Sequence, residues 1–164
     1  MAASLATHSM SRIGIISDTH GLLRAEATSF LRGCDRIIHG GDIGDAGILD
    51  ELASLAPVTA VRGNNDRGAW AESLPETALL QVDDVLIHVL HDLAQLDIEP
   101  SAAGVRVVVA GHSHRPLIEE RGGVLYVNPG SAGPRRFTLP IALAELLIVG
   151  RSVEPRIVEL SVSK

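Results

Sequence analysis

The sequence predicts an α/β fold, and three observations carry this prediction. In the first half of the chain, short apolar runs alternate with segments of helical spacing, which is the pattern of parallel strands joined by crossover helices. The second half is mostly strand. Hydrophobic residues make up 46% of the 164 residues but aromatic residues only 2%, so the core must be aliphatic. We expect two sheets packed face to face, with helices outside.

Three buried strands and two helices are expected in the first half. The apolar runs place strands at Ile13–Ile16, Arg36–His39 and Val58–Val61. Helical spacing predicts helices at Leu22–Leu31 and Ala46–Leu55. Each strand ends in a polar loop that contains glycine, and the carboxyl ends of strands in open α/β sheets line the ligand site.

The sequence of the second half of the chain predicts β-hairpins. Three strand pairs are expected around short turns: Thr77–Val82 with Val85–Leu90, Leu117–Glu120 with Val124–Val127, and Ile141–Val149 with Val153–Val162. A single apolar run, Val105–Ala110, predicts one more strand, and a short helix is expected near Leu93–Leu96.

The chain is expected to form one domain over residues 11–164, because we find no linker, repeat or low-complexity segment. Residues 1–10 are expected to be a disordered arm or a tag remnant. They lack the features of a secretory signal, and no run of about 18 apolar residues follows. The single cysteine, Cys34, cannot form an intramolecular disulfide. These features predict a cytoplasmic protein without a membrane span.

The charge balance limits the classes of partner. The net charge is −6, from 14 basic and 20 acidic residues, which argues against a dedicated nucleic-acid surface. A small phosphoester substrate remains compatible, because a bound metal ion can supply positive charge locally. Exposed edge strands could pair two copies, so a homo-oligomer is a further expectation.

Five polar clusters follow the predicted strands. They are Asp18-Thr19-His20, Gly41-Asp42-Ile43-Gly44-Asp45, Gly63-Asn64-Asn65-Asp66, His91-Asp92 and Gly111-His112-Ser113-His114. One such motif is a weak signal, but repeated delivery of Asp, Asn and His to one sheet edge is a strong one. Buried carboxylates and imidazoles are costly, and a bound cation satisfies several at once.

The side-chain types indicate a metal site. Carboxylate, amide oxygen and imidazole suit Mn, Fe, Zn, Ni or Co, while the lack of cysteine ligands argues against a structural zinc site. The alternate spacing of D-x-H and H-x-H puts both side chains of each pair on the same side of an extended segment. The candidate ligands are Asp18, His20, Asp42, Asn64, His91, His112 and His114.

At these residues the sequence resembles the calcineurin-like metallophosphoesterase superfamily. The motifs D-x-H, G-D-x-x-D, G-N-x-D, a lone His and G-H-x-H occur in that order, and the resemblance covers about residues 12–162. The small size and the Asn128-Pro129-Gly130-Ser131 turn are similar to the compact prokaryotic phosphodiesterase subfamily. The resemblance implies a four-layer αββα sandwich of two mixed β-sheets flanked by helices.

The resemblance also implies a binuclear mechanism. A hydroxide bridging two divalent metal ions, with Mn favoured over Fe, Ni, Co or Zn, would hydrolyse phosphodiesters or phosphomonoesters. Catalytic roles fall to Asp42, Asn64 and His20. The implied ligand division is Asp18, His20 and His114 for the first ion, Asn64, His91 and His112 for the second, and Asp42 as the bridge.

One position departs from the superfamily pattern. The superfamily carries a histidine, thought to protonate the leaving oxygen, where this chain has Asn65, and an amide cannot act as a general acid near neutral pH. Asp66, which would orient that histidine, then has no evident role. Asp92 either hydrogen-bonds a ligand imidazole or starts a turn. These three residues are candidates for contacts to the ligands or the substrate.

Other polar residues have structural interpretations. Asp45 is expected to cap the following helix. We interpret His39 as a core residue or a support for a ligand, and His88 as packing or surface. Arg135 and Arg136 either contact substrate phosphate or lie on the solvated surface.

Two classes of function remain open. One is the phosphoesterase; the alternative is a non-catalytic or weakly catalytic protein-interaction module on the same fold. The intact set of seven ligands favours the enzyme, whereas Asn65 favours the alternative.

Overall fold

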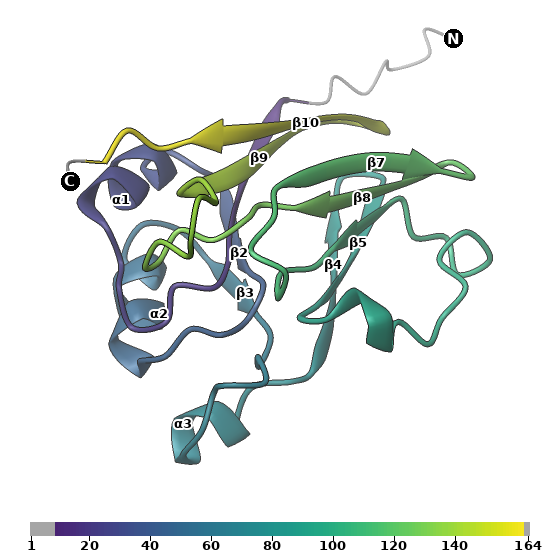
Figure 1. Cartoon of the computed structure of the whole chain (residues 1–164). Helices are drawn as coiled ribbons and strands as arrows, with labels where there is room; N and C mark the ends of the chain where they lie inside the picture. Colours follow the sequence, from purple (N-terminus) through teal and green to yellow (C-terminus); the bar gives the residue numbers. More distant parts are fainter. Residues whose placement is uncertain (1–8, 163–164) are drawn as a thin grey trace, which may run out of the picture.

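The computed structural model describes residues 9–162, and its centre is a pair of five-stranded sheets packed face to face (Figure 1). The sheets have the strand orders β10-β9-β1-β2-β3 and β4-β5-β6-β8-β7. The expected arm, residues 1–10, falls almost wholly outside the described residues.

The first sheet and its helices come from both ends of the chain. Its elements are β1 (Ser11–Ile16), α1 (Ala25–Leu31), β2 (Arg36–His39), α2 (Ala46–Ala53), β3 (Val58–Ala60), β9 (Ala142–Val149) and β10 (Ser152–Glu159). β1, β2 and β3 run parallel as predicted, while β9 runs antiparallel to β1 and pairs with β10 in a hairpin. The parallel part carries its three polar loops at one edge.

The second sheet comes from the middle of the chain. Its elements are α3 (Ala69–Glu72), β4 (Thr77–Val82), β5 (Val85–Leu90), the 3-10 turn η1 (Leu93–Gln95), β6 (Val107–Val109), β7 (Leu117–Arg121) and β8 (Val124–Asn128). β5, β6 and β8 are parallel, and the hairpins β4–β5 and β7–β8 have the predicted turns. Both sheets are therefore mixed.

Several predicted bounds differ from the structure; β6 and β10, for example, are shorter than the expected Val105–Ala110 and Val153–Val162. The first helix was expected from Leu22 but begins at Ala25, because Arg24 is extended and its guanidinium donates to the carbonyl of Gly133 at 3.2 Å. The four-residue helix α3 follows Gly68, whose φ is 101°. Its sequence is too short to show helical periodicity, and it was not predicted.

The core is aliphatic, as expected. Side chains such as Ile13, Ile15, Ile87 and Val107 are fully buried between the two sheets. α1 and α2 cover the outer face of the first sheet, where Leu31, Ile48 and Leu52 pack against it (Figure 1).

The fourth layer is thin. The αββα arrangement is confirmed, but among the described residues only η1 is helical on the outer face of the second sheet. Leu93, Leu96 and Ile98, in and after η1, pack over part of this face. None of the helices within residues 9–162 is long and apolar enough to cross a bilayer.

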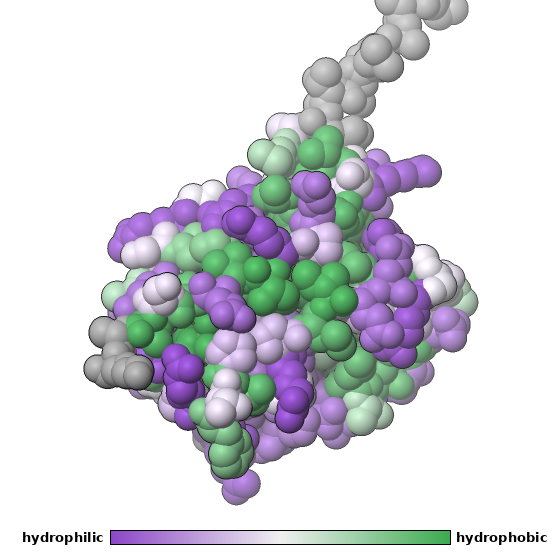
Figure 2. Space-filling view, turned by 45° about the horizontal axis from the view of Figure 1, so that its top comes forward, coloured by the Kyte–Doolittle hydropathy of each residue, from purple (hydrophilic) through white to green (hydrophobic). Residues whose placement is uncertain are grey.

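One face of the molecule carries exposed apolar residues. Figure 2 turns the top of Figure 1, with β7, β9 and β10, toward the viewer and shows an apolar area bordered by polar residues. Leu117 and Ile118 on β7 and Val149 at the end of β9 are exposed. β7 and β10 are edge strands, and association of two copies through these edges stays a prediction.

Candidate metal centre

The seven candidate ligands lie in loops at the carboxyl ends of five strands. Asp18 and His20 follow β1, Asp42 follows β2 and Asn64 follows β3. His91 directly follows β5, while His112 and His114 follow β6. The two sheets thus deliver all seven side chains to one end of the sandwich.

The backbone at the site is strained. Among the described residues, seven non-glycine residues have positive φ, and five of them are candidate ligands: Asp18 (54°), His20 (45°), Asp42 (55°), His112 (72°) and His114 (61°). Each such conformation costs on the order of 1–3 kcal/mol and persists only where the surroundings enforce it. The strain turns these side chains toward a common point instead of along the strand direction.

The first ligand group consists of Asp18, His20 and His114. Nε2 of His114 lies 3.3 Å from Oδ1 of Asp18, and Nε2 of His20 lies 3.8 Å from the same oxygen and 3.3 Å from Nε2 of His114. Oδ2 of Asp18 is anchored by the Ser17 hydroxyl at 2.7 Å. Oδ1 is buried without a hydrogen-bond partner. A buried, unpaired carboxylate oxygen between two imidazoles fits a cation site.

The second ligand group consists of Asn64, His91 and His112. Nδ1 of His91 donates to the carbonyl of Gly40 at 2.7 Å, which leaves Nε2 as the inward nitrogen. This Nε2 lies 2.9 Å from Oδ1 of Asn64 and 3.3 Å from Nδ1 of His112. Nδ1 of His112 is 3.2 Å from the same Asn64 oxygen. Three ligand atoms from three strands therefore converge.

Asp42 lies between the two groups. Its Oδ2 is 3.7 Å from Nε2 of His20 and 3.4 Å from Nε2 of His91. Asn65 holds both carboxylate oxygens: its backbone N–H donates to Oδ1 at 2.9 Å and its side-chain amide to Oδ2 at 3.0 Å. Gly63 is required here, because a Cβ at that position would collide with the backbone and carboxylate of Asp42.

The electrostatics favour ionised carboxylates. Burial raises the pKa of Asp42, but the contact with His91 and the hydrogen bonds from Asn65 outweigh it and hold that pKa far below its usual value. Burial likewise opposes ionisation of Asp18, yet His114 and Ser17 lower its pKa. Burial lowers the pKa of His20, although Asp42 and Asp18 counteract it.

The pKa of His91 is raised, in contrast to that of His20. Burial lowers its pKa, but the contact with Asp42 and the hydrogen bond to Gly40 raise it overall. A proton on Nε2 of His91 therefore competes for the position that a cation would take.

Asp66 has a role that the sequence did not reveal. It is 7% exposed. Its Oδ1 accepts from the backbone N–H groups of Ile43 and Gly44 at 2.8 and 3.0 Å, and its Oδ2 accepts from Gly63 at 2.9 Å. This carboxylate fastens the loop after β3 to the loop after β2. Asp66 therefore has a structural role in this chain without a histidine at position 65.

The remaining polar residues support the loops. Asp45 caps α2 through Gly47, as predicted. Asp92 starts the 3-10 turn, because it caps η1; its Oδ2 lies 3.9 Å from Nε2 of His112, too far for a hydrogen bond. His88 is 5% exposed, so it is a packing residue. Arg136 lies close enough to lower the pKa of His20.

His39 is a buried support. Its Nδ1 accepts from the N–H of Gly41 at 3.1 Å, so Nε2 carries the proton and donates to the hydroxyl of Thr19 at 3.0 Å. Thr19 in turn donates to the carbonyl of Ile43 at 2.9 Å. Burial lowers the pKa of His39 to about 4, so this imidazole is neutral and ties the loops after β1 and β2 together.

Comparison with known proteins decides the family. The family model of the calcineurin-like phosphoesterase superfamily domain matches residues 11–149. The chain belongs to the calcineurin-like phosphoesterase superfamily. Members of this metal-dependent superfamily are hydrolases, and the ligand-like clusters of this phosphoesterase chain agree with that.

Relatives of this phosphoesterase occur in archaea. A probable metallophosphoesterase of Methanocaldococcus jannaschii is 38% identical over 73% of the chain and 67% of its own length. One of Methanothermobacter thermautotrophicus is 35% identical over 89% and 91%. A phosphodiesterase of M. jannaschii is 29% identical over 73% and 82%.

The fold is shared more widely. The structure of vacuolar protein sorting 29 from Cryptosporidium parvum superimposes with a TM-score of 0.80 at 18% identity, over 93% of this chain and 92% of that one. At this identity the likeness concerns the fold alone.

Proposed function

We propose that this chain is a phosphodiesterase that works with two divalent metal ions held by the seven converging residues. One observation carries the proposal. Nε2 of His91 faces Oδ1 of Asn64 and Oδ2 of Asp42. The Nδ1 proton of His91 is already donated to the carbonyl of Gly40, so neutral His91 has no proton on Nε2. Three electron-pair donors that point at one another are stable only around a cation or a proton.

The distances support the ligand division that the family resemblance implies. Asp18, His20 and His114 would hold the first ion, and Asn64, His91 and His112 the second. Asp42 would serve both, because its Oδ2 reaches a histidine of each group. Oxygen and imidazole donors without thiolate suit Mn, Fe, Ni, Co or Zn, and we propose Mn as the family resemblance implies.

The two ions would supply positive charge for the phosphate oxygens and Lewis acidity for a bridging hydroxide nucleophile. The chain's own residues fix the geometry. Asn65 clamps Asp42 through two hydrogen bonds, and Gly40 sets the ring orientation of His91. The amide of Asn65 cannot protonate a leaving oxygen, so esters with good leaving groups should react fastest.

Metal-dependent hydrolysis of bis(p-nitrophenyl) phosphate tests the proposal. Protein stripped with a chelator should be inactive and should regain activity with Mn²⁺. Asp42→Asn should lower kcat/KM by about 100-fold or more, because even changes to residues that only hydrogen-bond a metal ligand typically cost about 10–100-fold. Asp45→Asn is the matched control, because Asp45 lies in the same loop but only caps α2. Absence of Mn²⁺-dependent turnover, or equal activity of the two variants, would overturn the proposal.

The alternative, a protein-interaction module without significant catalysis, predicts no metal-dependent turnover. Asn65 was the main argument for it. In the structure Asn65 orients Asp42, so its presence is consistent with an intact centre. The substrate we propose is a small phosphoester.

A further inference from the structure

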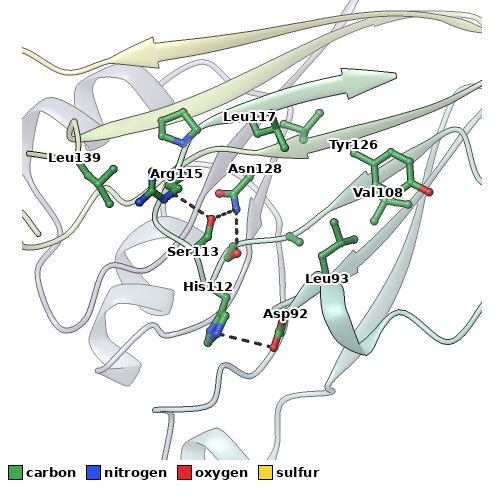
Figure 3. Close-up of a pocket in the computed structure, with 14 residues that line it drawn as sticks. Asp92, Leu93, Val108, His112, Ser113, Arg115, Leu117, Tyr126, Asn128 and Leu139 are labelled. Carbon is green, nitrogen blue, oxygen red and sulfur yellow. Dashed lines mark hydrogen bonds and ion pairs between the residues drawn. The ribbon is translucent and has the colours of Figure 1, made fainter. Parts of the chain in front are cut away.

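A recess of about 570 Å³ lies beside the metal centre on the outer face of the second sheet (Figure 3). It opens where the fourth layer of the sandwich is thin, next to η1. Its volume falls in the range of small-molecule pockets, about 300–1,000 Å³. Such a volume holds an organic group larger than a phosphate.

The recess is continuous with the proposed metal centre. His112 belongs to both, because its Nδ1 faces Asn64 while its ring also lines the recess. Asp92, 3.9 Å from Nε2 of His112, lines the same wall. A phosphoester held at the centre would therefore have one ester group beside this opening.

The walls of the recess are mainly apolar. Val108 on β6 and Tyr126 on β8 come from the outer face of the sheet, and Leu93 comes from η1 (Figure 3). Leu117, at the start of β7, and Leu139, in the loop before β9, line the other side. Five apolar side chains from five segments of the chain thus surround the space.

Two polar side chains that line the recess, Ser113 and Asn128, are already paired. The hydroxyl of Ser113 accepts from the side-chain amide of Asn128 at 3.1 Å and from the N–H of Arg115 at 3.2 Å. The Asn128 amide also donates to the carbonyl of Gly111 at 2.9 Å. These bonds fix the rim, and the mainly apolar walls favour an apolar occupant.

A neighbouring flank of the centre has different chemistry. A second recess of about 360 Å³ contains Asn64, His91 and Asp92 and is lined by the charged residues Arg62, Glu76 and Asp97. The two flanks therefore distinguish the two ester groups of a diester, one apolar and one polar.

We propose that the recess beside His112 binds the apolar ester group of the substrate. The enzyme then selects phosphodiesters that carry an aryl group, or an apolar group of similar size, over those with only small alkyl groups. This inference rests on the proposed phosphodiesterase function, and it names the substrate class of that site.

Two substrates with one leaving group test the inference. p-Nitrophenyl phenyl phosphate and p-nitrophenyl methyl phosphate release the same phenolate and differ in the retained ester group. After division by the rates of alkaline hydrolysis, the Mn²⁺-loaded enzyme should prefer the phenyl ester in kcat/KM by about tenfold or more, because the ring buries more apolar surface than a methyl group.

A variant that lines the recess and its control lie next to each other on one strand. Leu117 and Ile118 are 47% and 37% exposed neighbours on β7, but they point to opposite faces of the sheet and Ile118 does not line the recess. Leu117→Asn should lower the phenyl-to-methyl ratio at least about threefold, and Ile118→Asn should leave it unchanged. Leu139→Asn should lower the ratio in the same way as Leu117→Asn. Because Leu139 lies in a loop, this variant does not disturb a strand.

The outcomes separate this inference from the function beneath it. No preference for the phenyl ester, or the same change in ratio for Leu117→Asn and Ile118→Asn, would overturn the proposal that the recess binds the ester group. The proposed phosphodiesterase function would still stand. Absence of Mn²⁺-dependent turnover of both esters would overturn the function, and the inference with it.

Discussion

Replacement of Asp66 is expected to destabilise the fold far more than a typical loop substitution. Asp66 is almost fully buried and accepts three backbone hydrogen bonds, from Ile43, Gly44 and Gly63. Asp66→Ala leaves all three donors without this partner. At about 1–3 kcal/mol for each donor left unpaired, and with water reaching the Gly44 N–H, we expect a loss of about 3–5 kcal/mol.

The conservative variant refines the estimate. In Asp66→Asn the carbonyl oxygen can keep the bonds from Ile43 and Gly44, but the NH₂ group then faces the N–H of Gly63. Only one bond is lost, so we expect about 1–2 kcal/mol. Asp45→Ala serves as the control. It removes a single exposed bond, to Gly47, and helix caps contribute about 1 kcal/mol.

Urea unfolding of the chelator-treated proteins measures these differences without the contribution of bound metal. The free energy of unfolding should fall in the order wild type, Asn variant, Ala variant at position 66. If Asp66→Ala cost no more than Asp45→Ala, the carboxylate would not hold the two loops together, and our account of this region would be wrong.

Three further predictions follow from the same geometry. His39 has a pKa of about 4 against 6.5 unfolded, so its contribution to stability is complete above pH 6.5 and is lost as the pH falls toward 4. The loss should reach about 3 kcal/mol, and in unfolding experiments across this range His39→Asn should show a shallower pH dependence than wild type. Mn²⁺ at about 100 times its Kd should stabilise the fold by about 2.7 kcal/mol for each ion bound, seen as a rise in Tm that EDTA reverses, and an unchanged Tm would count against metal binding. Asn65→His keeps the backbone bond to Asp42 and adds a general acid, so it should raise turnover of alkyl phosphoesters relative to aryl esters. A leaving-group series at matched metal loading that shows no selective gain would mean that another group donates the proton.

The strands and the ligand set could be predicted from sequence because they share one physical cause. A strand buried on both faces is an uninterrupted apolar run, as in Val107–Val109, and polar residues directly after such a run need a reason to be there. Asp18, Asp42 and His91 each follow a run of this kind, so their position at one sheet edge follows from the pattern.

The supporting residues could not be predicted in the same way. Asp66 accepts hydrogen bonds from backbone N–H groups. No sequence pattern shows which peptide groups will donate to a carboxylate. From the sequence, Asn65 is only a departure from the superfamily pattern; its side-chain bond to Asp42, beside the bond from its backbone N–H, becomes visible only in the structure.

The apolar recess could also not be predicted from the sequence. Leu93, Tyr126 and Leu139 are far apart in the chain, and apolar residues at such positions are normally core. Only the thin outer layer over the second sheet leaves them lining a space. Whether a chain covers a sheet face depends on the path of its loops, which apolar periodicity does not indicate.

The most direct test of the two-metal centre is a count of bound Mn²⁺ per chain, by elemental analysis after reconstitution and removal of free ions. The wild type should bind two. His114→Ala, which depletes the first group, and His112→Ala, which depletes the second, should each bind about one, and Asp42→Ala should lose the most because its carboxylate reaches both groups. A wild-type protein that retains no Mn²⁺ would contradict the account, and so would a count that none of the three substitutions changes.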